Sequence, residues 1–122
     1  MTVQRVLVVK CTSGEDAPER CSQAFTVAST ALAAGASVSL WLTGESVWMA
    51  VPGRAEAFAL PHAAPLAELR DSVLAAGTLT VCTQCAARRG LTQDDFLPSV
   101  RIAGSATFVD EALQEDAQAL VY

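Results

Sequence analysis

Short apolar runs recur along the chain and predict strands. Residues 3–10, VQRVLVVK, and 37–43, SVSLWLT, combine β-branched residues with a largely apolar character. The same pattern returns at 78–82, TLTVC, and at the end of the chain in 118–122, QALVY. Runs of this kind are typical of strands buried in a parallel sheet. Residues 99–104, SVRIAG, predict either one more short strand or a loop.

Helical patterns separate these runs. In the segment 13–35, Pro18 falls in the first turn, and Phe25, Ala28 and Leu32 recur at the spacing of one buried helix face. Proline is common in the first turn of a helix, and glycine is common directly after its last turn. Such residues, together with the apolar spacing, mark the other helices. These helices are predicted over residues 45–51, 65–77, 83–90 and 105–117.

Alternating strands and helices predict the fold class. Connections of a dozen or more residues between strands imply parallel pairing with helices packed on the sheet. We therefore predict a single domain over 1–122, a small doubly wound α/β fold of flavodoxin-like or Rossmann-like type. Its sheet is mostly parallel, with helices on both faces. Residues 54–65, with prolines on both sides of His62, are predicted to be mostly loop, and 91–98 a turn or helical hook capped by Thr92.

Composition and charge narrow the possible partners. The chain is 52% apolar, which favours self-association to cover part of its surface. Its net charge of −5, with no basic run beyond Arg88-Arg89, argues against a nucleic-acid partner. No segment approaches the roughly 18 to 20 apolar residues of a membrane span, and the run before Lys10 is too short for a signal peptide. We therefore expect a cytoplasmic protein with reduced cysteines.

Candidate functional residues follow the predicted strands. In open parallel sheets, ligands bind outside the carboxyl ends of the strands. Cys11, Thr43 and Cys82 each stand at such an end, and Gly14 leaves room for the backbone near the first helix. We predict that Cys11, Gly14 and Thr43 line a substrate site together with Arg88. Neither GxGxxG nor GxxxxGK[ST] occurs in the sequence, so no nucleotide cofactor is predicted.

The stretch TLTVCTQCAARRGL, residues 78–91, carries the most specific chemistry. Cys82 is predicted to end a strand where a helix begins, and free N–H groups at a helix start favour a thiolate. Cys85 lies three residues on, so both sulfurs share one helix face. Arg88 adds positive potential if it turns toward the site. A thiolate attacks sulfane sulfur or a disulfide, so the motif favours sulfur transfer or dithiol exchange.

Two other interpretations of the cysteines stay open. A zinc site needs about four ligands, and one CxxC supplies two. Cys11 with Cys82 and Cys85 would complete such a site only if the loop carrying His62 folded back over it, so we predict no metal. The alternative is a non-enzymatic oligomeric module whose CxxC dithiol senses redox state. Cys21, within a helix, is expected to be a small buried apolar residue.

At VCTQCAARRGL the sequence resembles the DsrE/TusD-like sulfur-relay family, in which a cysteine ends a strand before a short Ala-rich helix closed by Arg-Gly. The resemblance extends over residues 6–50 and 103–122. It implies a flavodoxin-like domain that assembles into trimers or hexamers. It also implies that Cys82 carries a persulfide between a donor protein and an acceptor protein, as a sulfurtransferase-like carrier.

The chain departs from the carrier pattern at Cys85, where the carriers have a small apolar residue. A thiol at this position can attack a persulfide on Cys82, giving a disulfide and releasing sulfide. We therefore predict that Cys82 handles sulfane sulfur and that Cys85 is a resolving or modulating thiol.

Overall fold

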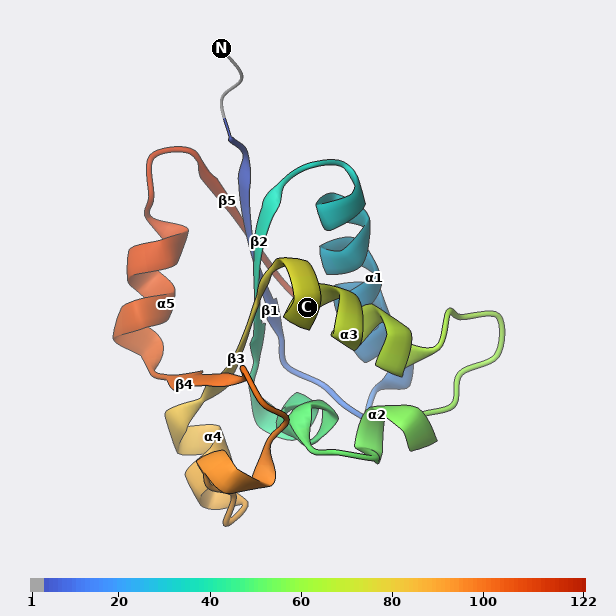
Figure 1. Cartoon of the computed structure of the whole chain (residues 1–122). Helices are drawn as coiled ribbons and strands as arrows, with labels where there is room; N and C mark the ends of the chain where they lie inside the picture. Colours follow the sequence, from blue (N-terminus) through green and yellow to red (C-terminus); the bar gives the residue numbers. More distant parts are fainter. Residues whose placement is uncertain (1–3) are drawn as a thin grey trace.

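The computed structural model describes residues 4–122 and contains one sheet of five strands, all parallel (Figure 1). The strand order is β4-β3-β2-β1-β5, so the chain first builds the sheet outward in one direction and then returns to the other side of β1. The predicted start of the first strand at residue 3 lies outside the described residues. The strands are β1 (Val6–Cys11), β2 (Ser37–Leu42), β3 (Thr78–Cys82), β4 (Arg101–Ala103) and β5 (Ala117–Val121).

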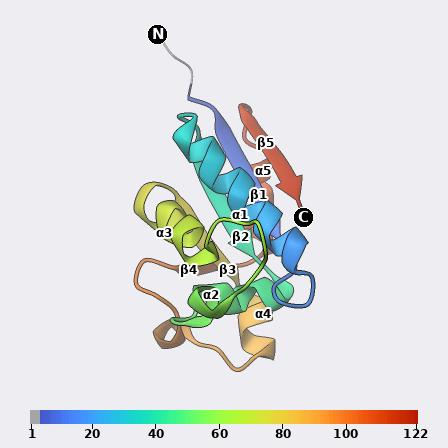
Figure 2. The same ribbon diagram turned by 90° about the vertical axis from the view of Figure 1, so that its right-hand side faces the viewer.

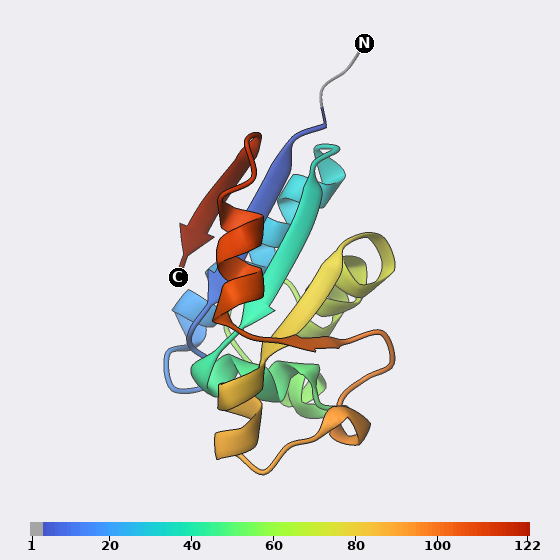
Figure 3. The ribbon, with the colours of Figure 1, turned by 90° about the vertical axis from the view of Figure 1, so that its left-hand side faces the viewer.

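Helices cover both faces of this sheet, as predicted. The helices α1 (Pro18–Ala33) and α3 (Leu66–Ala76) pack side by side on one face (Figure 2), and α5 (Ser105–Ala112) lies on the other (Figure 3). Short helical elements gather beyond the carboxyl ends of the strands (Figure 1). They are η1 (Gly44–Ala50), α2 (Arg54–Ala57), α4 (Thr83–Arg88) and η2 (Gln93–Asp95). In residues 4–122, no helix has the length and apolar character that crossing a membrane requires.

The main core lies between the sheet and the layer of α1 and α3. Alternate strand residues point into it, and Phe25 and Ala28 of α1 meet them, as their spacing predicts. Full burial of a large apolar side chain contributes about 1.5–3 kcal/mol, so this layer supplies most of the stability. The fully buried strand residues of the layer include Val9, Leu40, Leu42, Leu79 and Val81.

Arg70 of α3 is a buried charge within the helical layer. It is 2% exposed and forms two hydrogen bonds of 2.9 Å to the carboxylate of Glu56 in α2. The hydrogen bond from Arg70 lowers the pKa of Glu56 to about 2. This contact stabilises a helical turn over Arg54–Ala57, so the prediction that 54–65 is mostly loop is wrong for its first residues.

The structure also corrects the predicted end of the last helix and defines the predicted hook at 91–98. The last helix ends at Ala112 rather than 117, because Ala117 already pairs with Val6 and the chain needs residues between them to reverse direction. The hook at 91–98 is confirmed as η2. There Asp95 accepts a hydrogen bond from the backbone N–H of Thr92 at 2.8 Å, which closes a capping box.

Candidate functional site around Cys82

Cys82 lies where β3 passes directly into α4, at the carboxyl edge of the sheet. It ends the strand and caps the helix, with extended backbone angles of φ −65° and ψ 129°. Its side chain is partly exposed, whereas that of Cys85, one helical turn later, is 8% exposed. Of the two thiols in the CxxC motif, Cys82 is therefore the one that a second molecule can reach.

The surroundings of Cys82 favour its thiolate. Partial burial acts to raise its pKa, but several interactions outweigh that effect. The backbone and the side chain of Cys85 act on the Cys82 sulfur to lower its pKa, and the backbone of Gln84 and the charge of Lys10 act in the same direction. Together they hold the pKa of Cys82 below its ordinary value. In its thiol form, Cys82 donates to the side-chain oxygen of Gln84 at 3.4 Å.

Two arginines hold Cys85 and its helix in place. Nη1 of Arg88 lies 3.9 Å from the Cys85 sulfur, so Arg88 faces Cys85 rather than Cys82. Arg89 donates to the carbonyl of Cys85 at 3.0 Å and forms an ion pair of 2.7 Å with Glu45 of η1. These contacts fix α4 against η1, and with it the position of Cys85 beside Cys82.

Cys11 is placed away from this pair. Cys11 is aligned with Leu42 of β2, so both side chains point to the sheet face that α1 covers. Both are fully buried there. Its thiol donates to the carbonyl of Ser13 at 3.2 Å. Two effects raise the pKa of Cys21: the interaction with the side chain of Cys11 is the larger one, and burial is the second. The structure therefore does not bring Cys11 to Cys82, and it makes Cys21 a core residue.

Gly14 and Thr43 join the loops that surround the carboxyl edge. A Cβ atom at Gly14 would lie 2.6 Å from the carbonyl oxygen of Glu45, so this position needs glycine for close backbone packing. The backbone N–H of Thr43 donates to the carbonyl of Cys11 at 2.9 Å. Both residues thus take part in packing between the loops that follow β1 and β2.

The candidate metal ligands are not assembled. His62 lies in the loop after α2, beside Glu19 and Gln23 of α1. Across residues 4–122, no three side chains of His, Cys, Asp or Glu come close enough to hold a metal ion.

A row of polar and charged residues crosses the sheet beneath α5, and the sequence analysis did not identify it. Strand register aligns Lys10, Trp41, Thr80 and Arg101 on four neighbouring strands. Cys82 follows Thr80 by two residues and therefore points to the same face. The sequence does contain a signal for this row, because polar and apolar residues alternate within strands whose composition predicts burial on both faces.

Glu111 of α5 ties this row together. Its carboxylate accepts hydrogen bonds from Ser39, from the indole N–H of Trp41 at 3.0 Å and from Arg101. Burial acts to raise the pKa of Glu111, but these three donors outweigh it and leave the pKa below its usual value. The polar face is thus a satisfied network close to Cys82.

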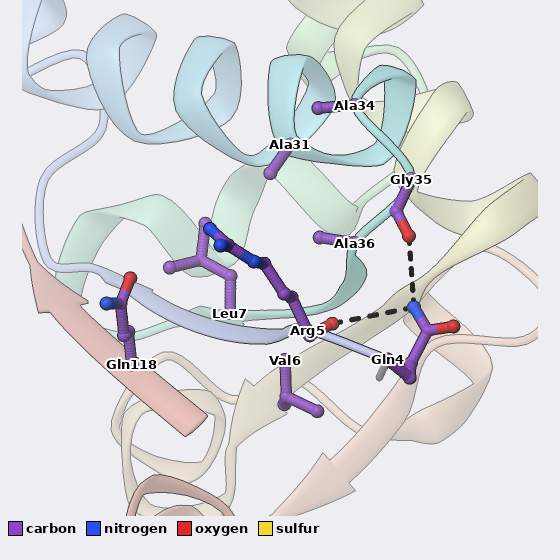
Figure 4. Close-up of a pocket in the computed structure, with 9 residues that line it drawn as sticks. All are labelled: Gln4, Arg5, Val6, Leu7, Ala31, Ala34, Gly35, Ala36 and Gln118. Atoms are coloured by element: carbon purple, nitrogen blue, oxygen red, sulfur yellow. Dashed lines mark hydrogen bonds between the residues drawn. The ribbon is translucent and has the colours of Figure 1, made fainter. Parts of the chain in front are cut away.

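A pocket of about 470 Å³ lies at the opposite edge of the sheet, where the strands begin (Figure 4). Arg5, Leu7 and Ala31 line it, and at its rim the side chain of Gln4 donates to the carbonyl of Gly35 at 3.0 Å. No cysteine lines this pocket, so it is separate from the Cys82 site.

Comparisons with known proteins agree on a family and a fold. The model of the DsrE/DsrF-like family matches residues 5–119. The structure of the YchN protein from E. coli is similar, with a TM-score of 0.77 and 14% identity over 98% of this chain and 100% of YchN. MTH1491 from Methanobacterium thermoautotrophicum, a protein of unknown function, has a TM-score of 0.72 and 11% identity over the same shares. No curated protein matches the sequence significantly.

Proposed function

The chain belongs to the DsrE/DsrF-like family, and from that premise we propose that it accepts and passes on sulfane sulfur through Cys82. The observation that carries this proposal is the environment of one accessible thiol. Cys82 is partly exposed, and backbone N–H groups of Gln84 and Cys85 favour its thiolate. Thiolates are the nucleophiles that attack divalent sulfur. The cysteines in residues 4–122 are free, which fits work in a reducing compartment such as the cytoplasm.

The loading step is a thiolate exchange. The Cys82 thiolate attacks the terminal, sulfane sulfur of a persulfide on a donor protein. A new S–S bond forms on Cys82, the S–S bond of the donor breaks, and the donor cysteine leaves as a thiolate. An acceptor protein with a nucleophilic thiolate reverses this exchange and removes the sulfur. The chain acts in this account as a carrier between two protein partners.

Cys85 limits the lifetime of the loaded state. Cys85 lies one helical turn after Cys82, and its side chain acts to lower the pKa of Cys82, which supports a close approach of the two sulfurs. When the Cys85 thiolate attacks the inner sulfur of the persulfide, a Cys82–Cys85 disulfide forms and hydrosulfide leaves. The sulfane sulfur is reduced to sulfide, and the two thiols supply the two electrons. A dithiol reductant is then needed to restore the starting state.

Intact-mass spectrometry after exposure to a persulfide donor tests this function. We expect the wild-type protein to gain one sulfur atom, C82S to gain none, and C85S to hold the added sulfur longer. C21S is the matched control, because Cys21 is fully buried, and it should load like the wild type. Normal sulfur uptake by C82S would contradict the proposal.

A redox dithiol is the second candidate, and the placement of Cys85 one helical turn after Cys82 favours it. In that case the same experiment gives a loss of two hydrogens rather than a gain of sulfur. The loss requires both cysteines and disappears in C82S and in C85S. In the wild type, attack of Cys85 on a persulfide would also end in this disulfide, so the two candidates are separated in C85S. That variant gains one sulfur atom in the first case and shows no change of mass in the second.

We also propose that the chain forms a homo-oligomer, a trimer or a hexamer. Large apolar side chains are exposed on α5, directly after it and on the edge strand β5: Val109, Leu113 at 78% and Val121 at 65%. Exposed apolar residues gathered on neighbouring elements are typical of subunit contacts. Light scattering coupled to gel filtration should give a mass of three or six chains, and V121E should lower it. A monomeric wild type would contradict this proposal.

A further inference from the structure

Lys10 is the only lysine in the chain, and it occupies an unusual place. It stands in β1 and is partly buried, on the sheet face that α5 covers. Its ammonium nitrogen lies 3.9 Å from the centre of the Phe108 ring of α5. A cation over an aromatic ring is attracted by the electron-rich face of the ring. The ring therefore holds the charge close to the sheet.

No carboxylate within the described residues forms an ion pair with Lys10. Glu111 is the acidic residue of the network on this face, and Ser39, Trp41 and Arg101 occupy its oxygens. The charges of Arg101 and Glu111 offset each other in their ion pair. Lys10 is thus an uncompensated positive charge on the polar face.

Strand register places this charge on the same side of the sheet as Cys82. Lys10 is aligned with Thr80 through Trp41 of β2, and Cys82 follows Thr80 by two residues. The strands β1 and β3 are separated by two strand spacings, about 10 Å, and Cys82 lies two residues, roughly 7 Å, further along β3 than Thr80. A lysine side chain can span much of that distance. On the same face, Arg101 of the neighbouring strand β4 is aligned with Thr80, but it is paired with Glu111. In α4 the ionisable groups are Cys85 and Arg88, and Arg88 is directed at the sulfur of Cys85.

We propose that Lys10 is a positioning residue that stabilises negative charge on the sulfur of Cys82, both in the thiolate and in the persulfide anion. This inference rests on the proposed function and adds a residue to that site. The interaction between Lys10 and Cys82 acts through space, without a hydrogen bond. Its strength depends on the partial burial of Lys10 and on the Phe108 ring that holds its ammonium group. The direction agrees with the effect of Lys10 on the pKa of Cys82.

Alkylation kinetics test the inference without any sulfur donor. The background is C85S, in which Cys82 is the partly exposed thiol and the buried Cys11 and Cys21 are protected. Rates with neutral iodoacetamide across pH give the pKa of Cys82, and the rate ratio of anionic iodoacetate to iodoacetamide reports the local charge. We expect K10M to raise the pKa of Cys82 and to lower both the rate at pH 7 and the ratio by about two- to fivefold.

Two matched variants separate a charge effect from a structural one. K10R keeps the positive charge and should restore the wild-type pKa and rate ratio. R5M removes the same charge at the beginning of β1, roughly 16 Å away along the strand, and should change neither quantity. K10Q serves in place of K10M if circular dichroism shows that K10M is misfolded.

The inference would be overturned if K10M and R5M gave the same alkylation rates across pH. It would also be overturned if K10R gave the same rates as K10M. Neither result depends on sulfur uptake. Failure of the proposed function would appear separately, as absence of a persulfide on a Cys82 whose thiolate reacts normally.

Discussion

The two faces of the sheet use the same five strands for different purposes. The face under α1 and α3 is apolar and carries Leu40, Leu42 and Val81, all fully buried. The face under α5 carries a polar row and a carboxylate with three donors. Cysteines occur on both faces. Cys11 is sealed in the apolar layer, whereas Cys82 emerges at the end of the polar one.

This difference shows that residue type alone does not decide whether a cysteine is reactive. Cys11 and Cys82 both stand at the carboxyl end of a parallel strand. Their neighbours differ because successive residues of a strand point to opposite faces. Cys11 is fully buried in the apolar core, where Cys21, Ser13 and Ser46 are its polar neighbours, whereas Cys82 is partly exposed at the start of α4. Under the proposed function, one face supplies stability and the other supplies the chemistry.

The largest expected effect compares two neighbouring residues of β2. Leu40→Ala removes a fully buried side chain from the apolar face and should lower the free energy of unfolding by about 2–5 kcal/mol. Ser39→Ala removes one hydrogen bond to the Glu111 carboxylate on the polar face and should cost about 1.5 kcal/mol, since Trp41 and Arg101 still donate to that carboxylate. Urea denaturation followed by circular dichroism measures both. Equal losses would mean that the two faces share the stabilising role.

Glu111→Gln tests the polar network itself. Because Trp41 and Arg101 lose a charged acceptor, the free energy of unfolding should fall by about 1–3 kcal/mol at neutral pH. The pKa of Glu111 is lowered in the folded state, so its stabilising effect is complete above the ordinary glutamate pKa of 4.5. This effect is lost as pH falls through the lower folded value.

The pH dependence provides the control for Glu111→Gln. Urea denaturation at several pH values should show the gap between wild type and E111Q closing as the solution becomes acidic, since both side chains are then uncharged. A gap that stays constant down to acidic pH would show that the carboxylate charge contributes nothing.

The smallest changes in the free energy of unfolding are expected for the cysteine variants. The variant that loses more stability should keep sulfur uptake, and the variant that loses less stability should lose it. Cys21→Ala leaves a small cavity in the core and should cost about 1 kcal/mol, with sulfur uptake unchanged. Cys82→Ala, at a partly exposed position, should cost less than about 0.5 kcal/mol and abolish uptake. Thermal unfolding and intact-mass spectrometry of the same samples check both parts. A large loss of stability in C82A would assign that thiol to structure.

The elements that follow from local signals were predictable. Apolar runs gave β1, β2 and β3, and Pro18 marked the start of α1. The position of Cys82 at a junction between strand and helix also followed from the sequence. Register did not, because it depends on which strands become neighbours. Without it, Cys11 was expected beside Cys82.

Contacts between distant segments explain what else was missed. The turn at Arg54–Ala57 depends on Arg70, which lies well beyond it in the chain. The network around Glu111 joins residues more than 60 positions apart in its bonds to Ser39 and Trp41. In the sequence, Lys10 only marks the end of an apolar run. Its contact with Phe108 forms because α5, far along the chain, packs on the sheet.

The central claim is that the reactive sulfur of this protein is that of Cys82, and alkylation mapping of the folded wild-type chain tests it most directly. Protein is quenched at increasing times in iodoacetamide, digested, and scored by mass spectrometry for each of the four cysteines. We predict that Cys82 is modified first, Cys85 later, and Cys11 and Cys21 only when the chain unfolds in denaturant. Modification of Cys11 or Cys21 as fast as Cys82 in the folded protein would contradict the account.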